Sequence, residues 1–434
     1  MIRVRLSLLM SLMPAAIVAQ PKYQPTPENL AARQWFQDAK LGMFIHWGIS
    51  SQLEDGEWVM ENKGIRTADY ERIAPDWNPT KFDADRWVGA AKTAGMKYIT
   101  LITKHHDGFA LWDSKASDWD VVDRTKYGKD LVRQIADACQ RQGIKLFFYH
   151  SQLDWHHPDY FPLGTTGKNS GRPAAGSFPR YLDYLDAQVT ELLTNYGPIG
   201  GIWFDGMWDK PTADWRLDQT YALIHRLQPA ALVGSNHHVT PFPGEDFQMF
   251  ERDLPGANSA GFNTTDISGL PLETSQTMND SWGFRLPDRA WKPSATLIRE
   301  MVTAAGLNAN YLLNVGPMPN GEFPPEANKI LADLGRWTST YGESIYGTRA
   351  GPIGRRPWGV TTAKAGRVYL HLLDWSERLL AIPAVAGKVT KAHRLSDGAP
   401  VPFTTDPNGL ILSLPLRAAE TIDEVIVLQL TPGR

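Results

Sequence analysis

Short apolar runs alternate with helical stretches between residues 43 and 315, and this alternation is the strongest constraint on the fold. Six runs have the composition of buried strands, at residues 43–46, 98–103, 146–150, 202–205, 232–236 and 311–315. The spacing between them predicts helices at residues 83–94, 131–141, 181–196, 218–227 and 295–305. Parallel strands joined by crossover helices favour an α/β fold of the TIM type, a (β/α)8-like barrel, over an open sheet. Because fewer than eight strands are legible, we expect the barrel to be irregular or incomplete.

The pattern changes after residue 347. Strand-like runs at residues 368–373, 379–385, 392–395, 409–414 and 424–430 are separated by Gly, Pro, Asp and Asn. Several short strands with regular turn signals predict a small β-sandwich. A chain of 434 residues is also longer than a usual single domain. We therefore expect a barrel domain at residues 21–347, followed by a C-terminal β-sandwich at residues 348–434.

The first twenty residues resemble a secretory signal peptide. Arg3 and Arg5 precede an apolar stretch from Leu6 to Val18, and Ala19-Gln20 follows as a small-residue cleavage site. A buried N-terminal helix is the alternative, but it would not explain the basic residues before the apolar run. The stretch is shorter than the ~18–20 residues that span a membrane, and no later segment reaches that length. We therefore expect residues 1–20 to be removed on export to the periplasm or the extracellular space, with no membrane anchor.

Charge and composition narrow the range of partners. The chain has 44 basic and 47 acidic residues and no long basic run, which argues against nucleic acid as a partner. The single cysteine, Cys139, lies in a predicted helix without a disulfide partner, so we expect a small buried apolar residue. Sixteen tryptophans suit stacking on sugar rings as well as filling a core. No oligomeric state is favoured by the sequence.

Polar side chains follow five consecutive predicted strands. The carboxyl ends of parallel barrel strands meet on one face, so these side chains are expected to form one site. Asp205 is the best candidate nucleophile, because the buried run Gly200–Phe204 delivers its carboxylate at the very end of a strand. The other strand ends carry His46-Trp47, Lys104-His105-His106-Asp107, Tyr149-His150-Ser151 and Asn236-His237-His238.

A carboxylate nucleophile among imidazole and indole rings suits the hydrolysis of a glycosidic bond, which needs a second carboxyl group as proton donor. Glu251 is the preferred acid, because the apolar neighbours Met249 and Phe250 can raise its pKa by desolvation. Glu273 is the alternative acid/base. Glu57 is expected to bind a hydroxyl group or to assist.

The adjacent histidines raise the question of a metal site. In an extended chain the rings of residues 105–106, 156–157 and 237–238 would face opposite ways within each pair, which does not suit a shared metal ion. We therefore expect no metal and no other cofactor. Three alternatives stay open at this point: a metallohydrolase, a barrel glycosidase acting on another sugar such as a galactoside, and a carbohydrate-binding protein without catalysis.

Five segments in order make the chain similar to the α-L-fucosidase family, glycoside hydrolase family 29. They are Phe44-Ile45-His46-Trp47-Gly48, Lys104-His105-His106-Asp107-Gly108-Phe109, Trp203-Phe204-Asp205-Gly206, Ser281-Trp282-Gly283 and Leu312-Leu313-Asn314-Val315-Gly316-Pro317. The resemblance implies a catalytic (β/α) barrel followed by a β-sandwich and needs no metal. It also implies exo-acting removal of terminal α-L-fucosyl residues from oligosaccharides or glycoconjugates, with retention of configuration through a fucosyl-enzyme intermediate.

The resemblance also implies roles for single residues. Asp205 matches the nucleophile, and Glu251 resembles the acid/base of several members. Positions that match sugar-binding residues are His46, Glu57, Trp58, His105 and His106, with Trp208 and Trp282 as aromatic walls. His150 stands where many members have tyrosine and is expected to bind substrate in its place. His238 falls where many members have an arginine near the site.

Overall fold

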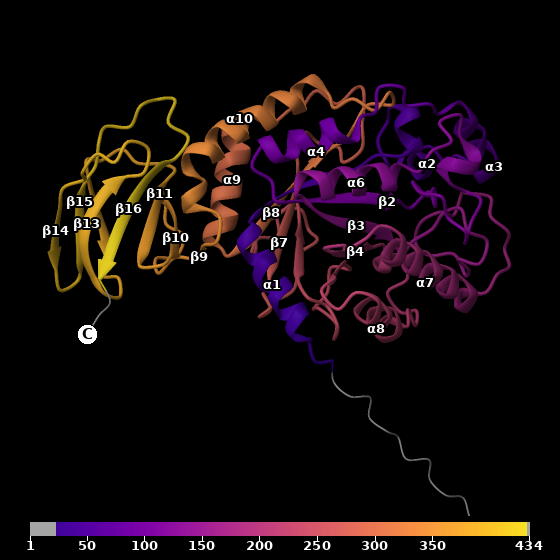
Figure 1. Ribbon diagram of the computed structural model, residues 1–434, viewed down its shortest axis with the longest axis horizontal. Coiled ribbons are helices and arrows are strands. Elements are labelled where there is room, and N and C mark those ends of the chain that lie inside the picture. Colours follow the sequence, from indigo (N-terminus) through magenta and orange to yellow (C-terminus); the bar gives the residue numbers. More distant parts are fainter. Residues whose placement is uncertain (1–22, 432–434) are drawn as a thin grey trace, which may run out of the picture.

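The structure is a computed structural model that describes residues 23–431, and it divides into a barrel and a smaller β-domain (Figure 1). The predicted signal segment at residues 1–20 lies outside the described residues. None of the helices within residues 23–431 is both long and apolar enough to cross a membrane.

Eight parallel strands form a nearly closed barrel, which confirms the predicted fold class. In space they follow the order β5-β4-β3-β2-β1-β8-β7-β6, so neighbouring strands are hydrogen-bonded everywhere except between β5 and β6. The strands are β1 (Leu41–Ile45), β2 (Tyr98–Lys104), β3 (Lys145–Ser151), β4 (Gly201–Asp205), β5 (Leu232–Asn236), β6 (Gln248–Glu251), β7 (Leu272–Thr277) and β8 (Ala309–Val315).

Two of these strands, β6 and β7, are absent from the sequence prediction. Both are short; half of the side chains of β6 (Gln-Met-Phe-Glu) and most of those of β7 (Leu-Glu-Thr-Ser-Gln-Thr) are polar. Neither has the apolar run or the strict alternation by which a strand is recognised. They nevertheless carry the two candidate acids, Glu251 and Glu273.

Helices surround the barrel, and the five predicted ones are present within three residues of their expected ends. The longer helices are α1 (Pro27–Ala39), α4 (Ala84–Thr93), α6 (Leu131–Gln142), α7 (Phe178–Asn195), α8 (Leu217–Leu227), α9 (Ser294–Gly306) and α10 (Pro325–Tyr341). Single turns form α2 (Val59–Asn62), α3 (Thr67–Tyr70) and α5 (Val121–Arg124).

Capping residues set the boundaries of these helices. For example, the Asp130 carboxylate accepts a hydrogen bond from the Arg133 amide at the start of α6, and Gly143 ends that helix in the left-handed conformation.

The C-terminal domain is a β-sandwich, as predicted. Its two antiparallel sheets have the orders β13-β16-β11-β10-β9 and β12-β15-β14. The strands are β9 (Arg349–Ala350), β10 (Gly359–Lys364), β11 (Arg367–Leu372), β12 (Leu379–Pro383), β13 (Lys388–Arg394), β14 (Phe403–Asp406), β15 (Gly409–Ser413) and β16 (Glu424–Thr431). Leu370, Leu412 and Leu428 are among the buried residues that form its core. Helices α9 and α10 lie between the barrel and the sandwich (Figure 1).

Two contacts of helix α1 complete the barrel at the end opposite the candidate site. Phe36 is fully buried and packs against Tyr98 and Phe147 at the start of β2 and β3. Arg33 donates to Asp246, with 2.6 Å between Nη2 and Oδ1. The buried Asp246 side chain in turn accepts from the amide of Val233 in β5 at 2.7 Å, at the open seam between β5 and β6. Helix α1 therefore helps to hold the seam that the strands themselves leave unpaired.

We expect Arg33→Met to lower the free energy of unfolding by about 3 kcal/mol, because it leaves the buried Asp246 charge without its guanidinium partner. Urea denaturation measures this change. The matched control is Arg141→Met, which removes an exposed pair with Asp85 and is expected to cost less than ~1 kcal/mol. Equal losses in the two variants would show that the Arg33 pair does not stabilise the seam.

Candidate active site

A cavity of about 330 Å³ opens at the carboxyl ends of the barrel strands. It brings together nine predicted site residues: His46, Glu57, Trp58, His105, His106, Asp205, Trp208, Glu251 and Trp282. It is further lined by Phe44, Tyr149, Trp203, Asn236, His238, Phe262 and Ser275. Aromatic faces with a few converging polar groups are typical of a ligand-binding cavity.

Asp205 ends β4 as the sequence predicts, and hydrogen-bond donors surround its carboxylate. Oδ1 accepts from the amide of Gly206 at 2.8 Å and from Trp208 Nε1 at 2.9 Å, and Oδ2 accepts from the Tyr149 hydroxyl at 2.9 Å. Gly206 adopts a φ of 99° and has no room for a side chain, because a Cβ there would lie 2.5 Å from Leu153 Cβ. The tight turn after the strand therefore fixes the direction of the Asp205 carboxylate.

Glu251 lies beside Asp205, and one amide group joins the two carboxyls. Asn236 Nδ2 lies 2.8 Å from Glu251 Oε2 and 3.4 Å from Asp205 Oδ1. These two oxygens can be no farther apart than the sum of those two distances. This close approach of one oxygen from each side chain is compatible with the ~5–5.5 Å between the carboxyl groups of retaining glycosidases.

The two carboxyls titrate differently because their neighbours differ. Burial, and next the charge of Glu251, raise the pKa of Asp205 to about 6. Burial also favours the protonated form of Glu251, but hydrogen bonds from His238 and Asn236 outweigh it and lower the pKa of Glu251. The His238 ring nitrogen Nε2 lies 3.2 Å from Glu251 Oε2. Between the two pKa values the pair holds a single proton.

Two buried histidines present unprotonated ring nitrogens to the cavity. The Asn314 amide donates to the Trp282 carbonyl at 2.7 Å, so its oxygen accepts from His46 Nδ1–H at 2.7 Å. The Ser151 hydroxyl donates to the Leu153 carbonyl, so it accepts from His106 Nδ1–H at 2.7 Å. These bonds leave Nε2 of both rings as an acceptor.

Burial keeps these two imidazoles neutral, because it lowers the pKa of His46 and of His106 to about 3. A neutral imidazole acceptor suits the hydroxyl groups of an uncharged sugar. The expectation that the rings of residues 105 and 106 face opposite ways is wrong: both line the cavity, with ring centroids 4.2 Å apart. Strand β2 ends at Lys104, so the alternation of an extended chain no longer applies to these two residues.

Aromatic rings and a third carboxyl complete the walls. Trp58 stacks on Trp208 with 14° between the ring planes, and Trp282 stacks on His46 at 29°. Glu57 Oε2 accepts from the Gly283 amide at 2.6 Å, and burial raises the pKa of Glu57. The contact ties the segment after β1 to the one after β7.

His150 does not bind in this cavity, contrary to the sequence prediction. Residues alternate in direction along β3, so Tyr149 points into the barrel and His150 points away from it. His150 is fully buried against Trp112, with Nδ1 3.1 Å from the hydroxyl of Thr103. Tyr149, one residue earlier, lines the cavity instead and donates to Asp205.

Glu273, the alternative acid, also lies outside the cavity. It is buried inside the barrel, where its carboxyl accepts from the Tyr98 hydroxyl at 2.5 Å and from Trp203 Nε1 at 2.9 Å. Burial raises its pKa to about 7. Glu273 therefore binds the indole nitrogen of Trp203 from inside the barrel and does not line the cavity beside Asp205.

Among the cavity residues that the sequence did not identify as site residues are Tyr149, Asn236 and Phe262. Tyr149 and Asn236 stand at predicted strand ends, and the alternation of a strand could have identified Tyr149. Phe262 lies in the long loop between β6 and β7, where no sequence pattern marks it.

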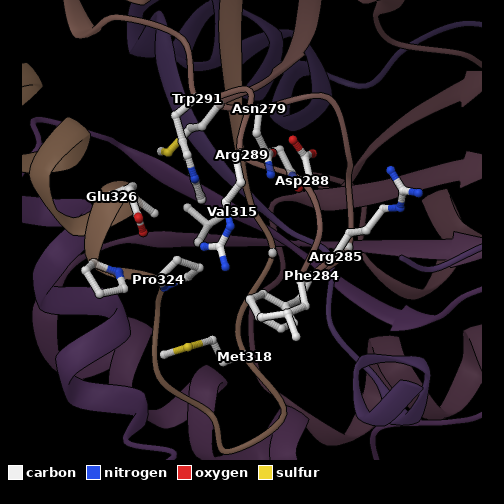
Figure 2. A pocket seen from close by; sticks show the side chains of 17 residues that line it. Asn279, Phe284, Arg285, Asp288, Arg289, Trp291, Val315, Met318, Pro324 and Glu326 are labelled. Atoms are coloured by element: carbon white, nitrogen blue, oxygen red, sulfur yellow. The ribbon is translucent and has the colours of Figure 1, made fainter. Parts of the chain in front are cut away.

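Figure 2 shows a second pocket. Its lining includes Gly283, whose amide donates to Glu57, and Asn314, whose amide oxygen accepts from His46. Phe284, Arg289 and Trp291 are among the side chains that line it. It contains neither Asp205 nor Glu251, so the pair of carboxyls belongs to the first cavity alone. Within residues 23–431, no three His, Cys, Asp or Glu side chains are grouped so that they could hold a metal ion.

Comparison with known proteins gives consistent results. The family model described as Alpha-L-fucosidase matches residues 10–343. Tissue alpha-L-fucosidase of Macaca fascicularis is 29% identical over 437 residues, which cover 92% of this chain and 89% of the relative. The structure of alpha-L-fucosidase isoenzyme 1 from Paenibacillus thiaminolyticus superposes with a TM-score of 0.84 at 36% identity, covering 93% of this chain and 100% of that one.

A third similar protein was captured during reaction. It is an alpha-L-fucosidase GH29 from Bacteroides thetaiotaomicron, a trapped covalent intermediate in complex with 2-fluoro-fucosyl fluoride in a glutamate-to-glutamine mutant. Its structure superposes with a TM-score of 0.81 at 27% identity and covers 95% of this chain and 98% of that one.

Proposed function

This chain belongs to the α-L-fucosidase family, as its sequence predicts, and we propose that it cleaves terminal α-L-fucose with Asp205 as nucleophile and Glu251 as acid/base. It is a retaining glycoside hydrolase. The observation that carries the residue assignment is the pair of carboxyls joined by Asn236, because a retaining glycosidase needs two carboxyls at close range. The substrates are fucosylated oligosaccharides or glycoconjugates.

In the first step Asp205 attacks the anomeric carbon while Glu251 protonates the departing oxygen. The bond to the aglycone breaks, and a β-linked fucosyl ester forms on Asp205. In the second step Glu251 takes a proton from water, and the water oxygen displaces Asp205 from the anomeric carbon. The two inversions release α-L-fucose. Tyr149 and Trp208 stabilise the carboxylate of Asp205 each time it becomes free.

The proton needed by this route is the one that the pair shares. The reaction requires Asp205 ionised and Glu251 protonated, whereas the order of the two pKa values before substrate binds places the proton mainly on Asp205. The active form is therefore the minor of two arrangements of a singly protonated pair. An aglycone that covers Glu251 and displaces water favours its protonated form, because desolvation disfavours the carboxylate.

Replacing each carboxyl by a small residue, with azide as an external nucleophile, tests the two roles. We expect Asp205→Gly to lose on the order of 10⁴-fold or more in kcat/KM on an aryl α-L-fucoside, because a covalent mechanism has no substitute for its nucleophile. Azide then attacks the substrate directly and gives the β-fucosyl azide. Glu251→Ala keeps Asp205, so azide attacks the fucosyl-enzyme and gives the α-fucosyl azide. NMR spectroscopy identifies each product.

The alternative acid is tested in the same assay. Glu273→Gln should give no fucosyl azide, because this carboxyl lies outside the cavity. Formation of the α-azide by Glu273→Gln, but not by Glu251→Ala, would overturn the assignment. The aryl α-galactoside serves as the substrate control, and its preferred hydrolysis would favour a different glycosidase.

The pH dependence follows from the pKa values of the pair. The singly protonated pair exists above the lowered pKa of Glu251 and is lost as pH rises through about 6, the raised pKa of Asp205. We therefore expect kcat/KM to fall about tenfold per pH unit above about pH 6. Steady-state kinetics from about pH 4 to about pH 8 measure this limb. An alkaline limb that begins well above pH 6 would mean that another group holds the catalytic proton.

We also propose that the protein is exported to the periplasm or the extracellular space. Support comes from Arg3 and Arg5 before the apolar stretch at residues 6–18. Expression of the full chain in a secreting host, with N-terminal sequencing of the product, is expected to show cleavage near Ala19. A product that keeps its first twenty residues would contradict export by this signal.

A further inference from the structure

Phe262 is a large apolar side chain left partly open at the rim of the fucosidase cavity. It is 38% exposed and lines the same cavity as Glu251. A single exposed apolar side chain on a protein surface needs no explanation. The position of Phe262 is distinguished by two contacts that attach it to the acid/base.

The first contact is a stack of two rings that ends on Glu251. Phe262 lies on His238 with ring centroids 5.0 Å apart and 20° between the planes. The other edge of the His238 ring reaches Glu251 Oε2 at 3.2 Å. His238 adopts a φ of 64°, a conformation that is uncommon for residues other than glycine and that has to be stabilised by its surroundings. The three side chains therefore form one fixed unit.

The second contact attaches the loop of Phe262 to the backbone of Glu251. Asn263 Nδ2 donates to the Glu251 carbonyl at 3.1 Å and lies 3.3 Å from Asp253 Oδ2. Asp253 also accepts from the Ala260 amide at 2.8 Å. The loop that carries Phe262 is thus fastened at the strand end that carries the acid/base.

This position determines what Phe262 can touch. The glycosidic oxygen must come within hydrogen-bond distance of Glu251 when that residue donates its proton. The first aglycone unit is bonded to that oxygen, so it lies at the rim beside Glu251. A pyranose presents a face of C–H groups that stacks on aromatic rings, whereas a peptide hydroxyl side chain has no such flat face.

We propose that Phe262, supported by His238, is the binding platform for the first aglycone residue and that this residue is a pyranose sugar. The inference rests on the proposed function of Asp205 and Glu251. It assigns to Phe262 a role in substrate choice and to His238 a role in positioning both the platform and the acid/base.

Two substrates that differ only in their leaving group test the platform. α-L-Fucosyl fluoride has no aglycone sugar, and its fluoride leaves without a proton, while disaccharides of α-L-fucose with N-acetylglucosamine or galactose carry the pyranose. We expect Phe262→Ala to lower kcat/KM about tenfold on the disaccharide that the wild type cleaves best, the size of one aromatic stacking contact. On the fluoride, kcat/KM should stay within about twofold of the wild type. Phe262→Trp should restore the disaccharide reaction.

The matched control is Val239→Ala, which truncates a neighbouring exposed side chain that does not line the cavity. It should change neither reaction, and thermal melting checks that each variant is folded. An equal loss on both substrates would show that Phe262 supports the fucose pocket, and no loss on either would show that it is only a surface residue. Both results overturn the inference and leave the fucosidase intact, whereas a wild type inactive on every fucoside would overturn the proposed function.

Discussion

Two largely buried carboxyl groups held close together are the feature on which the catalytic end depends. Like charges at this range repel strongly, and in a poorly solvated site the repulsion shifts one of them toward its protonated form. The Asn236 amide has two hydrogens and is placed to offer one to each carboxyl. Donors at Tyr149, Trp208 and His238 then distinguish the two groups. The two carboxyls can share one proton because each has different hydrogen-bond donors, so their pKa values differ.

The barrel register supplies this arrangement. Ser151, Asp205 and Asn236 are paired across β3, β4 and β5, so their side chains stand in one row at the carboxyl ends of the strands. Ser151 fixes the tautomer of His106, Asp205 is the proposed nucleophile, and Asn236 joins it to Glu251. Glu251 lies on β6, across the one seam without strand hydrogen bonds. The contact through Asn236 therefore spans, at the catalytic end, the gap that Asp246 spans at the opposite end.

Apolar strands could be predicted from the sequence, and polar ones could not. β1 to β5 and β8 bury continuous apolar runs, which single-sequence reasoning detects, and their ends pointed to Asp205 and to the histidine positions. β6 ends in Glu251, which lines the cavity, and β7 places Glu273 inside the barrel. The partners of Glu273 are Tyr98 of β2 and Trp203 of β4, on strands that do not adjoin β7, and no local pattern reveals such long-range partners. The error at His150 has a related cause, because a shift of one residue along a strand moves a side chain to the opposite face. Phe262 depends on the path of a loop, which only the folded chain defines.

The same division between strands and loops separates the proposed binding groups for fucose from the one proposed for the aglycone. The proposed fucose-binding groups, such as His46, His106 and Asp205, sit on or directly after strands, and hydrogen bonds from neighbouring residues orient them. The side chain beside the leaving group, Phe262, comes from the loop between β6 and β7. Loop positions can vary in sequence at little cost to the barrel. Asn263 of this loop donates to the Glu251 carbonyl, and Phe262 stacks on His238, which lies 3.2 Å from Glu251 Oε2. A change at Phe262 therefore also alters the surroundings of Glu251. If Phe262 is the aglycone platform and Glu251 the acid/base, as proposed, aglycone preference and proton transfer are coupled in this fold.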